Sequence, residues 1–378
     1  MASQALAQGA APANSLWRPV GSAAAWDAAV LALPRPHALQ SWAWGDFKSR
    51  WGWRARPLLL SVHDDPAAGP PQAAALVLKR RLGRLPFSFL YVPKGPILDY
   101  GDGALRRVIL AQLEALARRE RAIFVKIDPE VVVGWGADEP RRSPAGAKFI
   151  QELEARAWRF SPEQIQFRNT VEIDLERAPA ELLAAMKPKT RYNIRLAERR
   201  EVAVRPGGPA DLALIAEMYL ETAARDGFLA RPAAYYLDGW RTLLAAGMAQ
   251  PLIAEHDGRP LAAVIVVRYG RRAIYLYGAS SERERPRMPN YLLQWEAIRW
   301  AQAQGCQAYD MWGAPDAFDE SDRLWGVWRF KAGFNGQVVR HLGAYDFPAR
   351  PLLYWLFTAA LPRYRSWLRR GLRPAFGE

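Results

Sequence analysis

Residue types and patterns that mark several common protein classes are scarce in this chain of 378 residues. Its single cysteine, Cys306, excludes a disulfide framework and a zinc site built on cysteines. The four histidines are scattered without the spacing of metal ligands. No run of about 18 apolar residues occurs, so no membrane-spanning helix is expected. The phosphate loop, HExxH, GxSxG and GxGxxG patterns are also missing, which excludes the enzyme classes that depend on them.

Basic and aromatic residues are abundant instead. Lys and Arg number 52 against 38 Asp and Glu, a net charge of +14, and there are 16 Trp. The excess is largely Arg, which suits phosphate and carboxylate groups. Charge alone favours any polyanion and does not identify the partner. Half of the residues are hydrophobic, as in folded proteins, and the length predicts two domains.

The two ends of the chain have different compositions. Residues 1–15 lack the basic and apolar segments of a secretory signal, so we interpret them as a disordered tail of a cytoplasmic protein. The apolar stretch 351–361 is too short to span a bilayer and precedes several arginines. It fits an anionic membrane surface, or a terminal helix that packs back on the body. These arginines are Arg363, Arg365, Arg369, Arg370 and Arg373.

Hydrophobic periodicity predicts a similar order of elements in the two halves. Each half has helices and strands, then a long helix, then a strand. The expected strands are 58–62, 73–79, 87–92, 122–127, 170–175, 252–255, 261–267, 273–277 and 308–311, and the long helices are 104–120 and 290–304. Residues 134–144 are expected to form a loop. This order predicts mixed α/β sheets in two domains, 16–160 and 161–344, with 345–378 packing on the first.

A basic helix is expected near residue 190. Its cations are Lys187, Lys189, Arg191, Arg195 and Arg199. The three arginines are four residues apart and share one face, where like charges repel unless an anionic partner binds. The alternative is a solvated face balanced by nearby glutamates.

Polar residues also lie where predicted strands or helices end. Asp99 follows a strand, Tyr275 and Tyr277 end another, and Lys331 lies between aromatic residues. Each has a structural alternative, such as a helix cap for Asp99 or strand-end packing for the tyrosines. Two loose matches to a coenzyme A turn, at 18–23 and 205–210, are typical of chance in a chain rich in Arg, Gly and Ala.

Taken together, these segments resemble the Fem family (FemABX-like) of peptidoglycan interpeptide-bridge aminoacyltransferases. The resemblance runs from about Gln40 to Asp346 and depends on the order and spacing of its segments. These are 40–48, 91–99, 126–129, 187–197, 222–228, 231–236, 275–281, 289–290 and 329–334.

The resemblance implies two acetyltransferase-like (GNAT-like) domains and a reaction. The amine of a stem-peptide residue attacks the ester of an aminoacyl-tRNA and forms an amide. The acceptor is a lipid-linked or nucleotide-linked muropeptide, so contact with the cytoplasmic membrane leaflet is expected. No cofactor is expected. The helical arm inserted in the second domain of some members is not expected here, because no charged heptads occur between Asp211 and Lys331.

The resemblance also implies roles for individual residues. Lys48, Arg231 and Tyr235 match the positions that hold the acceptor's diphosphate region. Tyr277 matches an acceptor-contacting tyrosine, with Tyr275 as the alternative. Asp99 matches an acidic residue that orients the amine, since a carboxylate of ordinary pKa is a poor base for an ammonium group.

For Lys331 the resemblance implies stabilisation of the oxyanion at the acyl-transfer point. The basic helix 187–199 is expected to face tRNA. Two other interpretations remain open: an enzyme of the acetyltransferase fold that uses acyl-CoA or another aminoacyl acceptor, and a non-enzymatic RNA- or membrane-binding protein.

Overall fold

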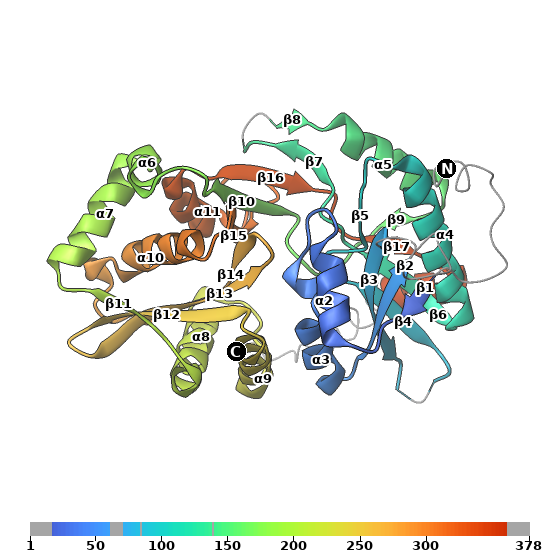
Figure 1. The fold of residues 1–378 in the computed structure, drawn as a ribbon, viewed down its shortest axis with the longest axis horizontal. Helices are drawn as coiled ribbons and strands as arrows, with labels where there is room; N and C mark the ends of the chain where they lie inside the picture. Colours follow the sequence, from blue (N-terminus) through green and yellow to red (C-terminus); the bar gives the residue numbers. More distant parts are fainter. Residues whose placement is uncertain (1–16, 61–70, 84, 138–139, 361–378) are drawn as a thin grey trace, which may run out of the picture.

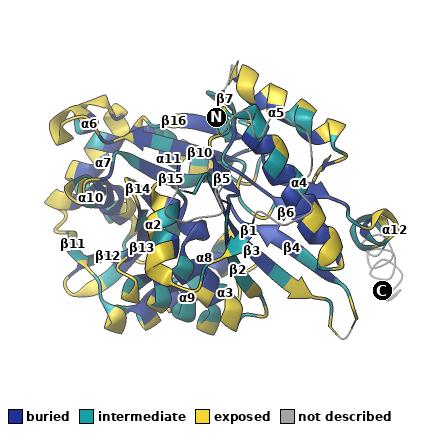
Figure 2. Cartoon of the chain, turned by 45° about the vertical axis from the view of Figure 1, so that its right-hand side comes forward, coloured by how far each residue is buried: buried dark blue, intermediate teal, exposed yellow. Residues whose placement is uncertain are grey.

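The computed structural model describes residues 17–60, 71–83, 85–137 and 140–360. The expected tail 1–15 and the arginines after residue 361 lie outside the described residues. Two mixed sheets lie side by side, each with helices on its faces (Figure 1). The predicted mixed α/β architecture is therefore confirmed. Buried residues follow the sheets, whereas the helices expose their outer sides (Figure 2).

The first sheet has eight strands in the order β1-β2-β3-β4-β6-β17-β9, with β5 on β3. Its strands are β1 (Trp17–Pro19), β2 (Arg54–Leu60), β3 (Ala73–Arg81), β4 (Ser88–Val92), β5 (Ile97–Leu98), β6 (Ala122–Ile127), β9 (Arg159–Phe160) and β17 (Tyr345–Phe347). Helix α4 (Gly103–Arg119) connects the parallel pair β4 and β6. The side chain of Asp102 caps this helix by accepting from the amides of Ala104 and Leu105.

The second sheet has nine strands in the order β11-β12-β13-β14-β15-β10-β16-β7-β8. They are β7 (Val132–Trp135), β8 (Arg141–Arg142), β10 (Asn169–Asp174), β11 (Ala203–Pro206), β12 (Ala249–His256), β13 (Arg259–Tyr269), β14 (Arg272–Ser280), β15 (Ala308–Ala314) and β16 (Gln337–His341). The expected strands 252–255, 261–267 and 273–277 are confirmed as β12, β13 and β14, which pair in sequence order as a meander.

The two halves exchange strands. The segment 134–144, predicted as a loop, instead contributes β7 and β8, and β7 pairs with β16 of the second sheet. The prediction was wrong because pairing with a strand 200 residues away leaves no local signal. In return β17, near the end of the chain, lies between β6 and β9 in the first sheet. A domain boundary near residue 160 remains a proposal, since each sheet holds segments from both sides of that residue.

Apart from α4, the helices of the described residues are short or medium in length. They are α2 (Ala23–Leu31), α3 (Trp42–Arg50), α5 (Pro144–Ala155), α6 (Pro179–Ala185), α7 (Pro188–Arg199), α8 (Leu212–Asp226), α9 (Ala233–Ala245), α10 (Pro289–Ala303), α11 (Trp325–Lys331) and α12 (Pro351–Trp355). No helical arm is inserted within residues 211–331, all of which the structure describes. Among the described ranges, no helix is long and apolar enough to cross a bilayer.

One hydrophobic core joins the halves where α3 meets α9. Phe47 of α3 lies against Gly239 of α9, where a Cβ atom would come within 3.0 Å of its ring. Trp26 and Trp240 are fully buried in the same cluster. This close approach of backbones brings the side chains at the ends of α3 and α9 together.

Candidate active site between the two halves

A cavity opens where strands β14 and β15 stop pairing. The two strands run parallel and are paired over Arg272–Ile274 and Ala308–Asp310. Beyond these pairs, residues of both strands line a cavity of about 520 Å³, together with α10 and α11. A space between two parallel strands at their carboxyl ends, next to a helix start, is a typical ligand site in α/β proteins.

Lys331 lies at the inner wall of this cavity, at the end of α11. Its Nζ donates to the carbonyl oxygens of Trp312 at 3.0 Å and Gly313 at 2.6 Å, and lies 5.7 Å from the ring of Tyr275. Burial lowers the pKa of Lys331 to about 7, although Asp310 opposes the shift. An ammonium has three donors, so one stays available to a ligand.

The mouth of the cavity is basic. Arg225 and Arg285 line it beside Asn290, which lies in the first turn of α10. Arg225 is held by the carbonyl of Ser280 at 2.7 Å and by Asp226. The start of a helix of 15 residues adds partial positive charge to these two guanidinium groups. The arrangement suits an anionic ligand whose neutral end enters the cavity.

A second cationic group lies where α3 meets α9. Lys48 donates from Nζ to the hydroxyl of Tyr235 at 2.8 Å. Its Nζ is 5.3–5.9 Å from the ring centres of Tyr235, Trp44, Phe47 and Trp53. The Arg231 guanidinium is 5.4 Å from the ring of Tyr235. The structure thus brings together the three residues predicted to hold a diphosphate.

Burial, then Arg231 and Arg80, lowers the pKa of Lys48 to about 8. These three causes disfavour the charge in two ways: burial removes water, and the two arginines repel the ammonium group. A bound anion would offset both effects. The group is therefore suited to a phosphate or diphosphate, which several cations hold at once.

Tyr277 lies between the two sites. It lines the cavity, and its ring is 5.9 Å from that of Tyr236, the neighbour of Tyr235. Burial, followed by repulsion from Tyr235, raises the pKa of the Tyr277 hydroxyl well above its usual value. Tyr275 lies on the same strand nearer to Lys331, and burial raises its pKa to about 12. The two tyrosines therefore line different parts of the same cavity.

The structure does not bring Asp99 next to Lys331. Asp99 is exposed, accepts from the amide of Gly101 at 2.8 Å, and lines a separate cavity with Tyr100 and Glu130. The capping role considered for Asp99 belongs to Asp102. The predicted role of Asp99 in orienting the amine stays a prediction.

A buried carboxyl group also lies near the site, and the sequence alone predicted no role for it. Asp128 accepts from the Tyr91 hydroxyl at 2.7 Å and from the amide of Lys94 at 2.5 Å. Burial raises its pKa to about 6. Lys94 in turn donates to the carbonyl of Phe167, which lines the Lys331 cavity. Like Asp99, Asp128 directly follows a strand, so the same signal marks both residues.

A buried ion cluster fixes the loop behind Lys331. Arg272 binds Glu130 of the first half and Glu172 and Asp310 of the second. Asp310 accepts from the amide of Trp312 at 2.8 Å, where the backbone has a positive φ of 61°. Because Lys331 donates to the carbonyl of Trp312, the cluster orients the ammonium group. These partners are too far apart in sequence to be predicted.

Helix α7 carries the predicted basic residues beside the same site. Its amide at Lys187 donates to the carbonyl of Gly333 at 2.9 Å, so its first turn lies against the segment that follows Lys331. Arg191 donates to the carbonyls of Ala184 and Met186 and closes α6. The remaining cations are exposed: Lys187, Lys189, Arg195 and Arg199.

Comparisons with known proteins agree with this architecture. The FemAB family model matches residues 26–242 and 245–361. The chain is 25% identical to a lipid II:glycine glycyltransferase of Staphylococcus haemolyticus (strain JCSC1435) in an alignment of 402 residues. The alignment covers 89% of this chain and 94% of that protein. It is 24% identical to a lipid II:glycine glycyltransferase of Staphylococcus aureus (strain USA300) over 410 residues, with the same coverage.

Solved structures show the same fold. The crystal structure of FemX superposes with a TM-score of 0.78 at 23% identity and covers 89% of this chain and 98% of that chain. A tandem GNAT protein from the clavulanic acid biosynthesis pathway gives 0.53 at 14% identity, covering 88% and 98%. The predicted pair of GNAT-like domains is confirmed.

Proposed function

Because the chain belongs to the FemAB family, we propose that it transfers an amino acid to the amine of a peptidoglycan stem peptide, which starts or extends an interpeptide bridge. Two relatives similar to it are lipid II:glycine glycyltransferases. The observation that carries the proposal is the pair of cationic sites, Lys48 with Arg231 and the Lys331 cavity, which Tyr277 connects. Such a pair suits two anionic substrates that must meet.

The acceptor binds with its diphosphate at Lys48, Arg231 and Tyr235. This assignment is supported by the depressed pKa of Lys48, which an anion would raise again. From there the stem peptide extends past Tyr277 towards Lys331. Lipid-linked and nucleotide-linked muropeptides both carry this diphosphate, and a lipid-linked one requires action at the inner face of the membrane.

The donor is an aminoacyl-tRNA. Its 3′ end enters the cavity between β14 and β15, with a phosphate near Arg225 and Arg285. The first turn of α7 lies against the segment that follows Lys331, and the exposed cations along this helix contact the RNA backbone. Arg191 is occupied by carbonyl groups of α6, so it contributes less to RNA binding than the other four cations.

In the reaction, the neutral amine of the stem peptide attacks the ester carbonyl. A C–N bond forms, the C–O bond to the ribose breaks, and the amine proton leaves as the ribose oxygen gains one. The charged form of Lys331 donates its third N–H to the oxyanion of the tetrahedral intermediate. Asp99 is proposed to orient the amine.

A transfer assay tests this function. Purified protein is mixed with labelled aminoacyl-tRNAs and a lipid-linked or nucleotide-linked muropeptide, and the product is weighed by mass spectrometry. We expect a gain of one or more aminoacyl residues. No gain with any donor, together with acylation of an amine by an acyl-CoA, would favour the acetyltransferase alternative.

The RNA surface is tested by replacing Lys189, Arg195 and Arg199 with Ala. We expect weaker tRNA binding and a shallower dependence of log affinity on log salt. An unchanged salt slope would mean that the basic face of α7 is solvated and does not bind RNA.

A further inference from the structure

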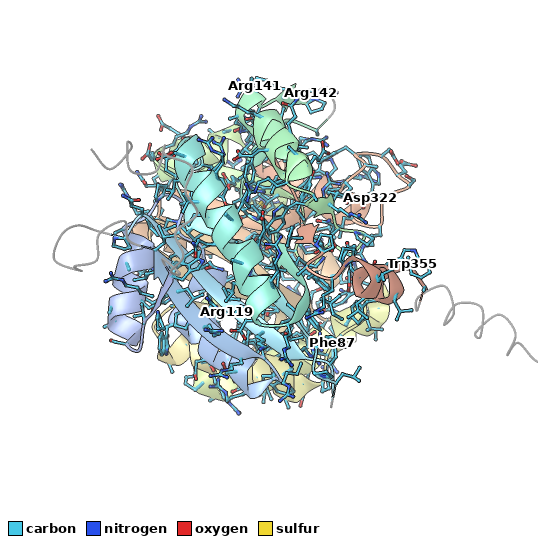
Figure 3. All side chains as sticks on the ribbon, turned by 90° about the vertical axis from the view of Figure 1, so that its right-hand side faces the viewer. Phe87, Arg119, Arg141, Arg142, Asp322 and Trp355 are labelled. Carbon is cyan, nitrogen blue, oxygen red and sulfur yellow. The ribbon has the colours of Figure 1, made fainter. Side chains whose placement is uncertain are left out.

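Helix α12 and the turn after it, residues 351–360, are apolar on both sides. Tyr354 packs on Phe124, with ring centres 5.6 Å apart, and Leu353 and Phe357 complete this packed face. On the other face Leu352 is 83% exposed, Trp355 56% and Leu356 44%. Figure 3 shows Trp355 projecting outward from α12. A surface helix that is apolar all round requires a second apolar environment.

A neighbouring hairpin turn extends this apolar surface. Leu85, 57% exposed, lies in the turn between β3 and β4, closed by its amide donating to the carbonyl of Leu82. Leu82 and Phe87 on either side pack into the same cluster as α12. Exposed apolar side chains from two segments thus flank one packed aromatic cluster.

Basic residues adjoin the apolar cluster at Phe87. The Arg350 guanidinium is 5.5 Å from the ring of Phe87, and Phe87 lines a surface hollow whose other cations come from β2, β3 and the end of α4. These cations are Arg54, Lys79, Arg81, Arg119 and Arg121. The one carboxylate that lines the hollow, Glu120, is paired with Arg56 and Lys79. The net charge of the surface is therefore strongly positive, and Figure 3 shows Phe87 and Arg119 on the face that also carries Trp355.

Aromatic rings connect this surface to the proposed diphosphate site. Nζ of Lys48 is 5.9 Å from the ring of Trp53, and Trp53 meets Phe89 edge-on at 5.4 Å. Phe89 is 6.2 Å from Phe357, in the turn after α12. Arg80 stacks 5.5 Å from Trp53 and also lowers the pKa of Lys48. The rings of Trp53 and Phe89 therefore lie between the Lys48 ammonium and Phe357.

We propose that this region is a docking surface for an anionic lipid bilayer, and that it presents the site to an acceptor in its lipid-linked form. The α12 surface consists of Leu85, Leu352, Trp355 and Leu356 together with Arg350 and the cations of the hollow next to Phe87. Exposed leucines and tryptophan enter the interface while arginines contact anionic head groups. A lipid-linked diphosphate at Lys48 then keeps its hydrocarbon chain in the bilayer beside α12. The docking itself is independent of catalysis, whereas its link to the acceptor rests on the proposed function.

Vesicle flotation of the full-length protein tests the docking. We expect binding to equimolar phosphatidylcholine and phosphatidylglycerol vesicles that weakens with added salt, and much weaker binding to phosphatidylcholine alone. The double variant Leu352→Glu/Trp355→Glu should partition at least about tenfold less. Arg119→Glu/Arg121→Glu should lose most of the salt-sensitive part. The control Leu31→Glu changes a leucine of similar exposure, 43%, on α2 and should bind like the wild type.

Binding of the double variant equal to that of the wild type would overturn the proposal. The proposal would also be overturned if the wild type bound no vesicles but formed a dimer in size exclusion, and if the double variant were a monomer. That result would assign the surface to a second copy of the chain.

A transfer assay with two acceptors tests the link to the substrate. With lipid-linked muropeptide in the same vesicles, the double variant should be at least about tenfold slower than the wild type. With nucleotide-linked muropeptide in solution, the two proteins should be equal. Equal losses with both acceptors would refute delivery through the bilayer. If no donor gives transfer while flotation behaves as expected, the proposed function fails and the docking surface stands.

Discussion

The charge on Lys331 makes the pH dependence of transfer a sharp test of its role. Nζ has three N–H donors, and two of them donate to the carbonyl oxygens of Trp312 and Gly313, which leaves one for an oxyanion. Its pKa is lowered to about 7, so about half of the protein carries the charge at pH 7, and each further pH unit reduces that fraction about tenfold.

The attacking amine responds in the opposite direction. Its pKa is about 10.4, so its neutral fraction rises about tenfold per pH unit below that value. If charged Lys331 stabilises the oxyanion, the single-turnover rate with both substrates saturating rises about tenfold per unit up to pH 7. Between about pH 7 and pH 10 the two effects cancel and the rate is flat.

Lys331→Met removes the donor and keeps the length of the side chain. We expect it to be about 100- to 1000-fold slower at pH 7, the cost of one oxyanion donor. Its rate should continue to rise up to about pH 10, so the deficit shrinks about tenfold per unit above pH 7. Lys148→Met, a substitution of an exposed lysine on α5, is the matched control and should follow the wild type.

Two results would refute this reasoning. A wild-type rate that rises about 100-fold per unit below pH 7 would mean that the neutral amine of Lys331 acts, as a base. Parallel profiles for the wild type and Lys331→Met would mean that the ionisation of Lys331 does not affect the reaction.

Three further predictions concern other groups. Lys48→Met should raise KM for either acceptor about 10- to 100-fold with little change in kcat, because it removes a charge-assisted contact; a change in kcat alone would place the anion elsewhere. Asp99→Asn should leave the melting temperature unchanged, since Asp99 is exposed and makes one turn hydrogen bond, and should lower kcat about tenfold; unchanged transfer would remove Asp99 from the site. Burial lowers the pKa of both His37 and His341 to about 3. The unfolded chain therefore binds protons below pH 6.5 that the folded protein does not, and the free energy of unfolding should fall as the pH drops from about 6.5 to 3. The melting temperature of the His37→Gln/His341→Gln variant should fall less steeply over that range than that of the wild type.

Local patterns predicted much of the fold. The apolar runs along 252–277 predicted the strands β12, β13 and β14, and the amphipathic run from residue 104 predicted α4, because their partners are close in sequence. The strand β7 could not be predicted in this way. Its partner β16 supplies the hydrogen bonds from a distant part of the chain, and Val132–Trp135 has no alternation strong enough to indicate a strand on its own.

Part of the candidate site was predictable from the sequence and part was not. Lys48 and Tyr235 were paired through the resemblance to a family, and the structure brings their side chains to 2.8 Å although 187 residues separate them. The cluster of Arg272 with Glu130 and Asp310 had no such guide. Charged residues in strands usually indicate a solvent-exposed edge, and only the packing of the two halves shows that these charges are buried together.

The position of β17 has a consequence for synthesis. Since Tyr345–Phe347 lies between β6 and β9, the first sheet cannot close while the ribosome is still making the second half of the chain. During most of translation β6 keeps an open edge, which is a template for wrong pairing with other nascent chains. The amino-terminal half cannot therefore complete its fold first and wait for the rest; both halves reach their final form only when almost the whole chain has left the ribosome.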